Sequence, residues 1–232
     1  MKIVASIEAR MTSSRLPGKV LMQILNKSVL EILIQRVRKA KYVTDIIVAT
    51  TTNKEDDPID KLCSRLGIKV FRGSEPDVLG RVYEAHWYVN SDIVVELTGD
   101  NPLVDPALID LCVLKYLYSN ADYVSTALKP FFPYGQAIQV FPFTILKDLN
   151  ENALTKFDRE HVTPSIYNNP KEFKIVSIIG NNKQFAPDQR HTLDTKEDFD
   201  RIKYLIENIS GDFRSSKIED LITLVKKYDT RW

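Results

Sequence analysis

The chain has 232 residues, of which 44% are hydrophobic, enough to bury a full core as one α/β domain. Its 32 Lys and Arg nearly balance 31 Asp and Glu, and the formal net charge of +1 argues against a general nucleic-acid-binding or membrane-surface protein. No apolar run reaches the roughly 18 residues of a membrane span, and Arg10 and Arg15 lie where a signal peptide needs its apolar stretch.

The first predicted element is a buried strand from Ile3 to Ile7, and a loop rich in cations leaves its end. The loop, residues 9–19, reads Ala-Arg-Met-Thr-Ser-Ser-Arg-Leu-Pro-Gly-Lys. Open α/β folds bind ligands at such loops, and cations among small hydrogen-bond donors suit a polyphosphate. An ordinary solvated loop is the alternative, but its three cations would repel one another. Neither the P-loop pattern nor the dinucleotide fingerprint is present, so we expect an anion site of another kind.

Strand and helix patterns then alternate as far as residue 118. Ser28 and Glu31 form a capping box at the start of a helix with apolar residues up to Val37. The elements predicted after it are, in order, a strand at 45–50, a helix at 57–67, a strand at 68–71, a helix at 78–89, a strand at 93–97 and a helix at 106–118. This order predicts half of a doubly wound α/β sheet.

Two cysteines, Cys63 and Cys112, fall on the apolar faces of two of these predicted helices. They offer neither a disulfide framework nor the spacing of a metal site, and we expect buried structural thiols. A reducing cytoplasm follows as the expected location.

The pattern changes beyond Asp122. We predict strands at 123–126, 137–141 and 173–179, and helices at 143–150, near 159–166 and from 196 onward. No repeat, low-complexity stretch or linker divides the chain. The simplest interpretation is a single domain of residues 1–232, in which 127–180 is an insertion that extends the sheet or forms a flap.

Two acidic residues follow predicted strands. Asp100 lies just past the end of a buried strand, beside Gly99, where it can reach a metal ion held by phosphates. The alternative is an Asp that only caps a turn before Pro102. In the segment 190–199, a short strand is expected to deliver Asp194 to the same cleft, while Thr195 and the next acids start a helix. Two carboxylates from distant sequence would suit Mg²⁺ that neutralises a triphosphate.

Six segments together resemble the cytidylyltransferases of bacterial surface-carbohydrate synthesis. They match the branch of spore coat polysaccharide biosynthesis protein F and, more distantly, the synthetases of CMP-activated Kdo and sialic acids. The segments occur in the family's order and span nearly the whole chain: residues 8–21, 47–52, 70–81, 97–103, 159–164 and 193–195. The resemblance implies a Rossmann-like doubly wound mixed sheet of the nucleotide-diphospho-sugar transferase type, CTP and Mg²⁺ as substrate and cofactor, and a homodimer with no nucleic-acid or membrane partner.

The resemblance also assigns roles to residues. Two groups of residues would bind the nucleotide: Ala9, Arg10, Ser13, Ser14, Arg15 and Lys19 from the first loop, and Arg72, Gly73, Ser74 and Arg81 on the base and ribose side. Arg15 and Lys19 are best placed for the β and γ phosphates, and both are expected on the surface. Asp100 and Asp194 match the metal ligands. Arg10, Arg15, Lys19 and Asp100 would form the catalytic set. An acceptor oxygen would attack the α-phosphorus and expel pyrophosphate, which needs positioning and charge neutralisation and no covalent nucleophile.

The insertion at 127–180 would bind the acceptor or form the dimer contact. Relatives usually read Gly-Leu-Asp-Val-Glu-Val-Phe where this chain has residues 135–141, so Ala137 and Gln139 replace two acids. If both face the acceptor, the lost charges favour an acceptor that carries a phosphate or carboxylate. The acceptor set would be Gln136, Ala137, Gln139, Glu160 and His161, with a buried structural role as the alternative for His161. His191 replaces the large apolar or aromatic residue expected there.

Other functions stay open from the sequence. Guanylyl or another nucleotidyl transfer to a sugar 1-phosphate is the alternative within the same chemistry. A metal-dependent glycosyltransferase would need a D-x-D motif, and this chain has Gly99-Asp100-Asn101-Pro102 instead. A nucleotide sensor without catalysis would not need the cationic loop together with both acids.

Overall fold

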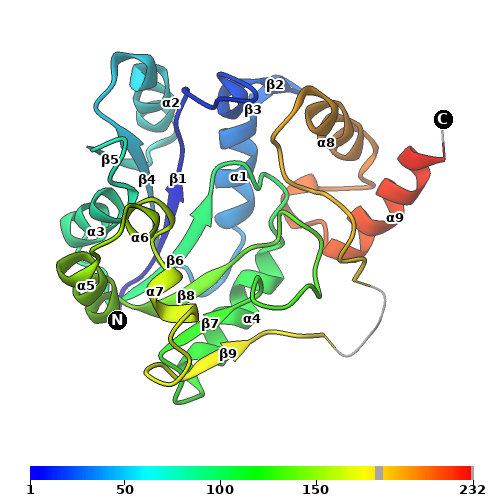
Figure 1. Ribbon diagram of the computed structural model, residues 1–232. Helices are drawn as coiled ribbons and strands as arrows, with labels where there is room; N and C mark the ends of the chain where they lie inside the picture. Colours follow the sequence, from blue (N-terminus) through cyan, green and yellow to red (C-terminus); the bar gives the residue numbers. More distant parts are fainter. Residues whose placement is uncertain (181–184, 231–232) are drawn as a thin grey trace.

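A seven-stranded sheet runs through the computed structural model, which describes residues 1–180 and 185–230 (Figure 1). The strand order is β5-β4-β1-β6-β8-β7-β9. In chain order the strands are β1 (Ile3–Glu8), β4 (Asp45–Thr51), β5 (Lys69–Gly73), β6 (Ile93–Thr98), β7 (Tyr123–Ser125), β8 (Gln139–Pro142) and β9 (Ile175–Ser177). The expected doubly wound α/β fold is confirmed, and β8 and β9 from the 127–180 insertion belong to the same sheet.

Strand direction decides where functional residues meet. β5, β4, β1 and β6 are mutually parallel, whereas β8 runs antiparallel to both of its neighbours. The carboxyl ends of the parallel strands therefore share an edge with the start of β8. In the register of the sheet, Glu8 lies opposite Thr98, and Glu96 lies opposite Gln139. Four polar residues from three strands are thus neighbours at this edge.

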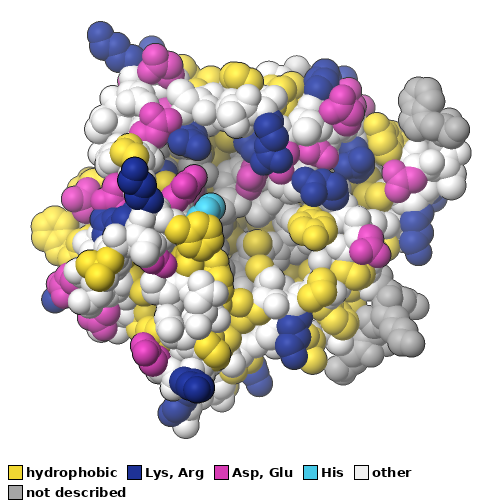
Figure 2. Space-filling view, in the orientation of Figure 1, with side chains coloured by type: hydrophobic (Ala, Val, Ile, Leu, Met, Phe, Trp, Pro, Cys, Tyr) yellow, Lys and Arg dark blue, Asp and Glu magenta, His cyan; other side chains and the backbone are white. Residues whose placement is uncertain are grey.

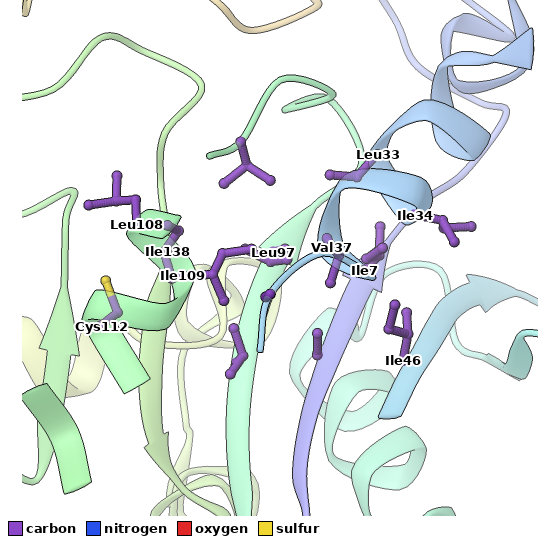
Figure 3. Packing of buried hydrophobic residues seen from close by; sticks show 14 of the residues in the cluster. Ile7, Leu33, Ile34, Val37, Ile46, Leu97, Leu108, Ile109, Cys112 and Ile138 are labelled. Carbon is purple, nitrogen blue, oxygen red and sulfur yellow. The ribbon is translucent and has the colours of Figure 1, made fainter. Parts of the chain in front are cut away.

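Helices cover both faces of the sheet. On one face, α1 (Val29–Val37), α2 (Asp57–Leu66) and α4 (Pro106–Leu117) pack against alternate strand residues such as Ile7 and Leu97 (Figure 3). On the other face, α3 (Val78–Tyr88) and α5 (Phe143–Asn152) pack against Val94 and Phe141. Successive side chains of a strand point to opposite faces of the sheet. At the carboxyl ends of β1 and β6, the side chains on the α3 face are polar.

A smaller apolar cluster joins the last helices to the start of α1. α8 (Lys196–Asn208) and α9 (Ile218–Asp229) contribute Phe199, Ile202 and Leu221 to it. Ile24 also belongs to this cluster. It lies in a two-stranded hairpin, β2 (Gln23–Ile24) and β3 (Lys27–Ser28), which the sequence analysis missed. The 3₁₀ turns of the described residues are η1 (Lys19–Leu21), η2 (Lys54–Asp56) and η3 (Phe213–Ser215).

Two predictions about local structure are wrong. The single helix expected near 159–166 is two short helices, α6 (Lys156–His161) and α7 (Pro164–Tyr167). The break lies at Val162, whose φ is +65°, and it is favoured because Pro164 has no amide hydrogen and disfavours helical geometry in the residue before it. The strand expected to carry Asp194 is a single bridge between Arg190 and Tyr134, followed by an irregular segment.

Both cysteines are free and buried, as expected. Burial raises the pKa of the Cys63 thiol to about 12, so it stays protonated and unreactive at neutral pH. None of the helices in the described ranges has both the length and the apolar surface that a membrane span requires.

Candidate functional site

A cavity of about 370 Å³ opens at the carboxyl ends of β1 and β6. Figure 2 shows this face of the molecule hollowed near its centre, with Lys and Arg side chains above the hollow and hydrophobic side chains below it. All six residues expected from the first loop line the cavity: Ala9, Arg10, Ser13, Ser14, Arg15 and Lys19. Five other predicted residues reach it from elsewhere in the sequence: Arg81, Asp100, Glu160, His161 and Asp194.

Two acidic residues that the sequence analysis missed hold the first loop in place. The Glu75 carboxylate accepts hydrogen bonds from Arg10 Nη1 at 3.1 Å and from Thr12 Oγ1 at 2.7 Å. Asp56 is fully buried and accepts from the backbone N–H of Met11 at 2.7 Å. Both acids lie beyond the carboxyl ends of neighbouring strands. This position in the sequence could have indicated that both acids lie near the site, but it does not predict which loop residues they bind.

A tight turn closes the loop and directs Lys19 inward. Gly18 adopts a φ of +74°, and its N–H donates to the carbonyl of Met11 at 2.8 Å. Glycine accepts this left-handed conformation without a Cβ penalty. The chain then enters η1, where Lys19 is the first residue.

Lys19 lies between the two acids expected to bind a metal. Its Nζ is 3.1 Å from Asp194 Oδ1 and 3.5 Å from Asp100 Oδ2, and it donates to the carbonyl of Leu193 at 2.6 Å. The expectation of a surface lysine is therefore wrong, since these contacts leave Lys19 only 8% exposed. Arg15 is exposed as expected, and its Nη2 lies 2.8 Å from Asp194 Oδ1.

The carboxylates of Asp100 and Asp194 fit a divalent cation that also takes ligands from a bound phosphate group. Asp100 and Asp194 face the same ammonium, so one positive charge is already shared between them. Within residues 1–180 and 185–230, no group of three or more His, Cys, Asp and Glu side chains is placed to hold a metal ion by itself. Mg²⁺ is commonly bound through one or two carboxylates, with phosphate oxygens and water as its other ligands.

Arg81 lines the first cavity, whereas three residues assigned with it to the nucleotide do not. The Arg72 side chain donates to the carbonyl of Thr51 at 2.8 Å and to Asp57 at 2.7 Å. Gly73 and Ser74 continue from it, and the Ser74 carbonyl accepts from Arg81 Nη1. Burial lowers the pKa of Arg81, whose guanidinium places a positive charge at the cavity wall.

A second cavity, of about 660 Å³, adjoins the first and shares four of its residues: Glu8, Thr98, Glu160 and His161. Glu160 and His161 belong to α6 and are exposed, so the alternative of a buried structural histidine at 161 is wrong. α6 is fixed by Arg159, whose Nε donates to Asp77 Oδ1 at 2.7 Å at the start of α3. This ion pair sets the position of the wall between the two cavities.

The residues expected to bind the acceptor lie in different places. Gln139 lines the second cavity, where its Oε1 accepts from Thr163 Oγ1 at 2.5 Å and from Tyr123. Gln136 is buried beside a third cavity, bonded to the backbone of Leu103 and Asp105 at 2.9 Å each. Ala137 also lines that third cavity, of about 270 Å³, because β8 begins only at Gln139 and strand alternation does not extend back to residue 137.

A pair of acids forms the floor of the second cavity and was missed as part of the site. Glu96 is 3% exposed and lies on β6 with its side chain toward Glu8, and the two carboxyls share a hydrogen bond. Burial raises the pKa of both groups, which favours a pair that shares one proton through this hydrogen bond. The signal was available, since an acid interrupts the apolar run of residues 93–97.

His191 is fully buried and lies outside both cavities. Burial lowers its pKa to about 3, so it is neutral and fills the core position expected to hold a large apolar residue.

We expect Glu96→Gln to stabilise the fold above pH 5. The folded chain binds more protons than the unfolded chain from the ordinary carboxyl pKa of 4.5 up to the raised pKa, so stability falls as pH rises through that window. The amide removes one ionisable group and can still donate to Glu8. Thermal unfolding at pH 5 and pH 8 should show a stabilisation that grows with pH, with exposed Glu84→Gln as the control. An equal or lower midpoint at pH 8 would contradict this expectation.

Known proteins with similar sequences agree with this geometry. A family model described as cytidylyltransferase matches residues 4–221. Spore coat polysaccharide biosynthesis protein SpsF of Bacillus subtilis is 34% identical over 230 residues, covering 97% of this chain and 94% of that protein. A cytidylyltransferase structure from Leptospira borgpetersenii superposes with a TM-score of 0.92 at 31% identity, covering 99% of this chain and 96% of the other. CMP:2-keto-3-deoxy-manno-octonic acid synthetase complexed with CTP shares the fold, with a TM-score of 0.67 at 16% identity over 89% of this chain and 99% of the other.

Proposed function

Because this chain belongs to the cytidylyltransferase family, we propose that it transfers the cytidylyl group of CTP to a sugar-type acceptor and releases pyrophosphate. The observation that carries the proposal is the convergence of Arg15, Lys19, Asp100 and Asp194 on one cavity that adjoins a second. The product would serve surface polysaccharide synthesis, as the name of the Bacillus subtilis relative suggests. We place the enzyme in the cytoplasm, where its two free thiols stay reduced.

The roles of the side chains follow from their charges. Arg15 and Lys19 neutralise the β and γ phosphates and hold them in place, and buried Arg81 adds a further positive charge to the cavity lining. The acceptor lies in the second cavity, and its oxygen forms a bond to the α-phosphorus as the bond to pyrophosphate breaks. Asp100 and Asp194 would hold Mg²⁺, which supplies positive charge to the transferring phosphate group. Fixed charges of this kind need no rearrangement during the reaction.

The decisive experiment measures pyrophosphate release from each of the four nucleoside triphosphates, with Mg²⁺ and a panel of sugars, sugar acids and sugar phosphates. CTP should support release only when an acceptor is present, and chelation of the metal should stop it. A preference for GTP with sugar 1-phosphates would replace this proposal by guanylyl transfer. Release of a nucleoside diphosphate from a sugar nucleotide would indicate a glycosyltransferase instead.

Arg15→Ala is expected to lower kcat/KM for CTP by at least about tenfold. The change removes one charge-assisted contact with the triphosphate, worth about 1.5 to 3 kcal/mol. Arg15 is exposed, and among the residues that the structure describes it bonds only to Asp194, so the unfolding midpoint should stay near that of the wild type. Steady-state kinetics and thermal melting check the two halves of this expectation. Wild-type kinetics for Arg15→Ala would place the triphosphate elsewhere.

A further inference from the structure

We propose that the second cavity binds a part of the acceptor that presents hydroxyl or amino groups and carries no carboxylate or phosphate. The proposal rests on the proposed function, because it names the class of acceptor for that reaction. It replaces the expectation, drawn from Ala137 and Gln139 alone, of an anionic group at this position.

The charges that line the cavity carry the first step. Glu8 and Glu96 lie at its floor and Glu160 at its wall, and none of the described residues lining it is Lys or Arg. The cations that act on Glu8, namely Arg81 and Arg10, line the first cavity instead. A carboxylate or phosphate in the second cavity would therefore meet the negative charges of Glu160 and of the Glu8–Glu96 pair, with no Lys or Arg among the described lining residues, and burial of the pair strengthens the repulsion.

Unsatisfied oxygen atoms carry the second step. Glu96 Oε2 and Glu8 Oε1 are buried and have no hydrogen-bond partner among the residues that the structure describes. The two carboxyls already use their shared proton between them. These oxygens can only accept further hydrogen bonds, so a ligand that satisfies them must supply O–H or N–H donors.

Gln139 adds a donor of its own. Its Oε1 accepts from the hydroxyls of Thr163 and Tyr123, so the amide N–H₂ group of this cavity-lining residue is the donor that a ligand can use. A hydroxyl group can donate to a carboxyl oxygen and accept from this amide at the same time. An ammonium group can satisfy only the carboxyl oxygens. The cavity thus suits a ring or chain that carries hydroxyl groups. An amino group in place of a hydroxyl can still donate to Glu8 and Glu96.

Four sugars that share one ring test the proposal: glucose, glucosamine, glucuronate and glucose 6-phosphate. Binding is followed by saturation-transfer NMR in the presence of CTP and Mg²⁺, and turnover by pyrophosphate release. Glucose or glucosamine should bind at least about tenfold more tightly than the two anions, and the order of these two separates hydroxyl from amino recognition. Tighter binding of either anion, or no binding of glucose and glucosamine, overturns the proposal.

Two variants test whether the cavity itself sets this preference. Gln139→Lys places a cation in the cavity and should shift binding toward the two anions by about tenfold. Glu96→Leu removes both carboxyl oxygens and should weaken glucose and glucosamine several-fold, while Glu84→Leu on the exposed side of α3 changes neither. An unchanged preference in both cavity variants overturns the proposal. CTP binding is measured separately by calorimetry, so a failure of the proposed function, seen as lost CTP binding, is distinguished from a failure of this inference.

Discussion

Asp100→Asn is expected to reduce pyrophosphate release at saturating CTP by roughly 100-fold or more, the effect of losing several kcal/mol of charge stabilisation in the transition state. The amide keeps nearly the same shape but loses the anionic oxygen. It also places a neutral group 3.5 Å from the site of the Lys19 ammonium. The fold should be retained, because Asp100 is only partly buried and its Oδ1 accepts one bond from Thr98 within the same turn.

Calorimetry with CTP in the presence and absence of Mg²⁺ tests the cause of this loss. The variant should lose the part of CTP binding that depends on the metal, whereas wild-type protein keeps it. Asp148→Asn, an exposed position on α5, is the matched control and should change neither binding nor turnover. An active Asp100→Asn enzyme would refute the assignment of a metal to the two acids.

Lys19→Ala is expected to lower kcat/KM for CTP by roughly 10- to 100-fold and also to destabilise the fold. The first effect follows from the loss of a charge-assisted contact of about 1.5 to 3 kcal/mol. The second follows because the Leu193 carbonyl and the Asp194 carboxylate lose a buried partner at 2.6 and 3.1 Å.

A comparison with Arg15→Ala separates the two effects. Both residues contact Asp194, but Arg15 is exposed, so only Lys19→Ala should lower the urea midpoint. Equal stability of the two variants would mean that the Lys19 contacts are not made in solution.

Elements with local signals could be predicted from the sequence, and contacts between distant segments could not. α2 begins at Asp57 before Pro58 and ends where Gly67 adopts a φ of +64°, as the residues at its ends indicated. The buried strand β1 and the position of Asp100 after β6 were likewise visible. The bond from Arg10 to Glu75 joins residues 65 positions apart, and no periodicity encodes such a pairing.

The burial of Lys19 was mispredicted for the same reason. A lysine in a loop of charged and hydroxyl residues is ordinarily solvated, and only the approach of residues 193–194 covers it. Glu96 differs, because an acid inside a buried strand is itself an anomaly that the sequence displays.

The surroundings of Asp194 imply a thermodynamic linkage between nucleotide and metal. Its carboxylate is balanced by Lys19, Arg15 and Arg190, at 3.1, 2.8 and 3.3 Å. A triphosphate bound as proposed should draw the first two cations toward itself and so release the carboxylate for a divalent ion. By the closure of the binding cycle, each ligand then raises the affinity for the other by the same factor. We therefore expect occupancy of the two proposed sites to be cooperative, through an exchange of counterions around Asp194.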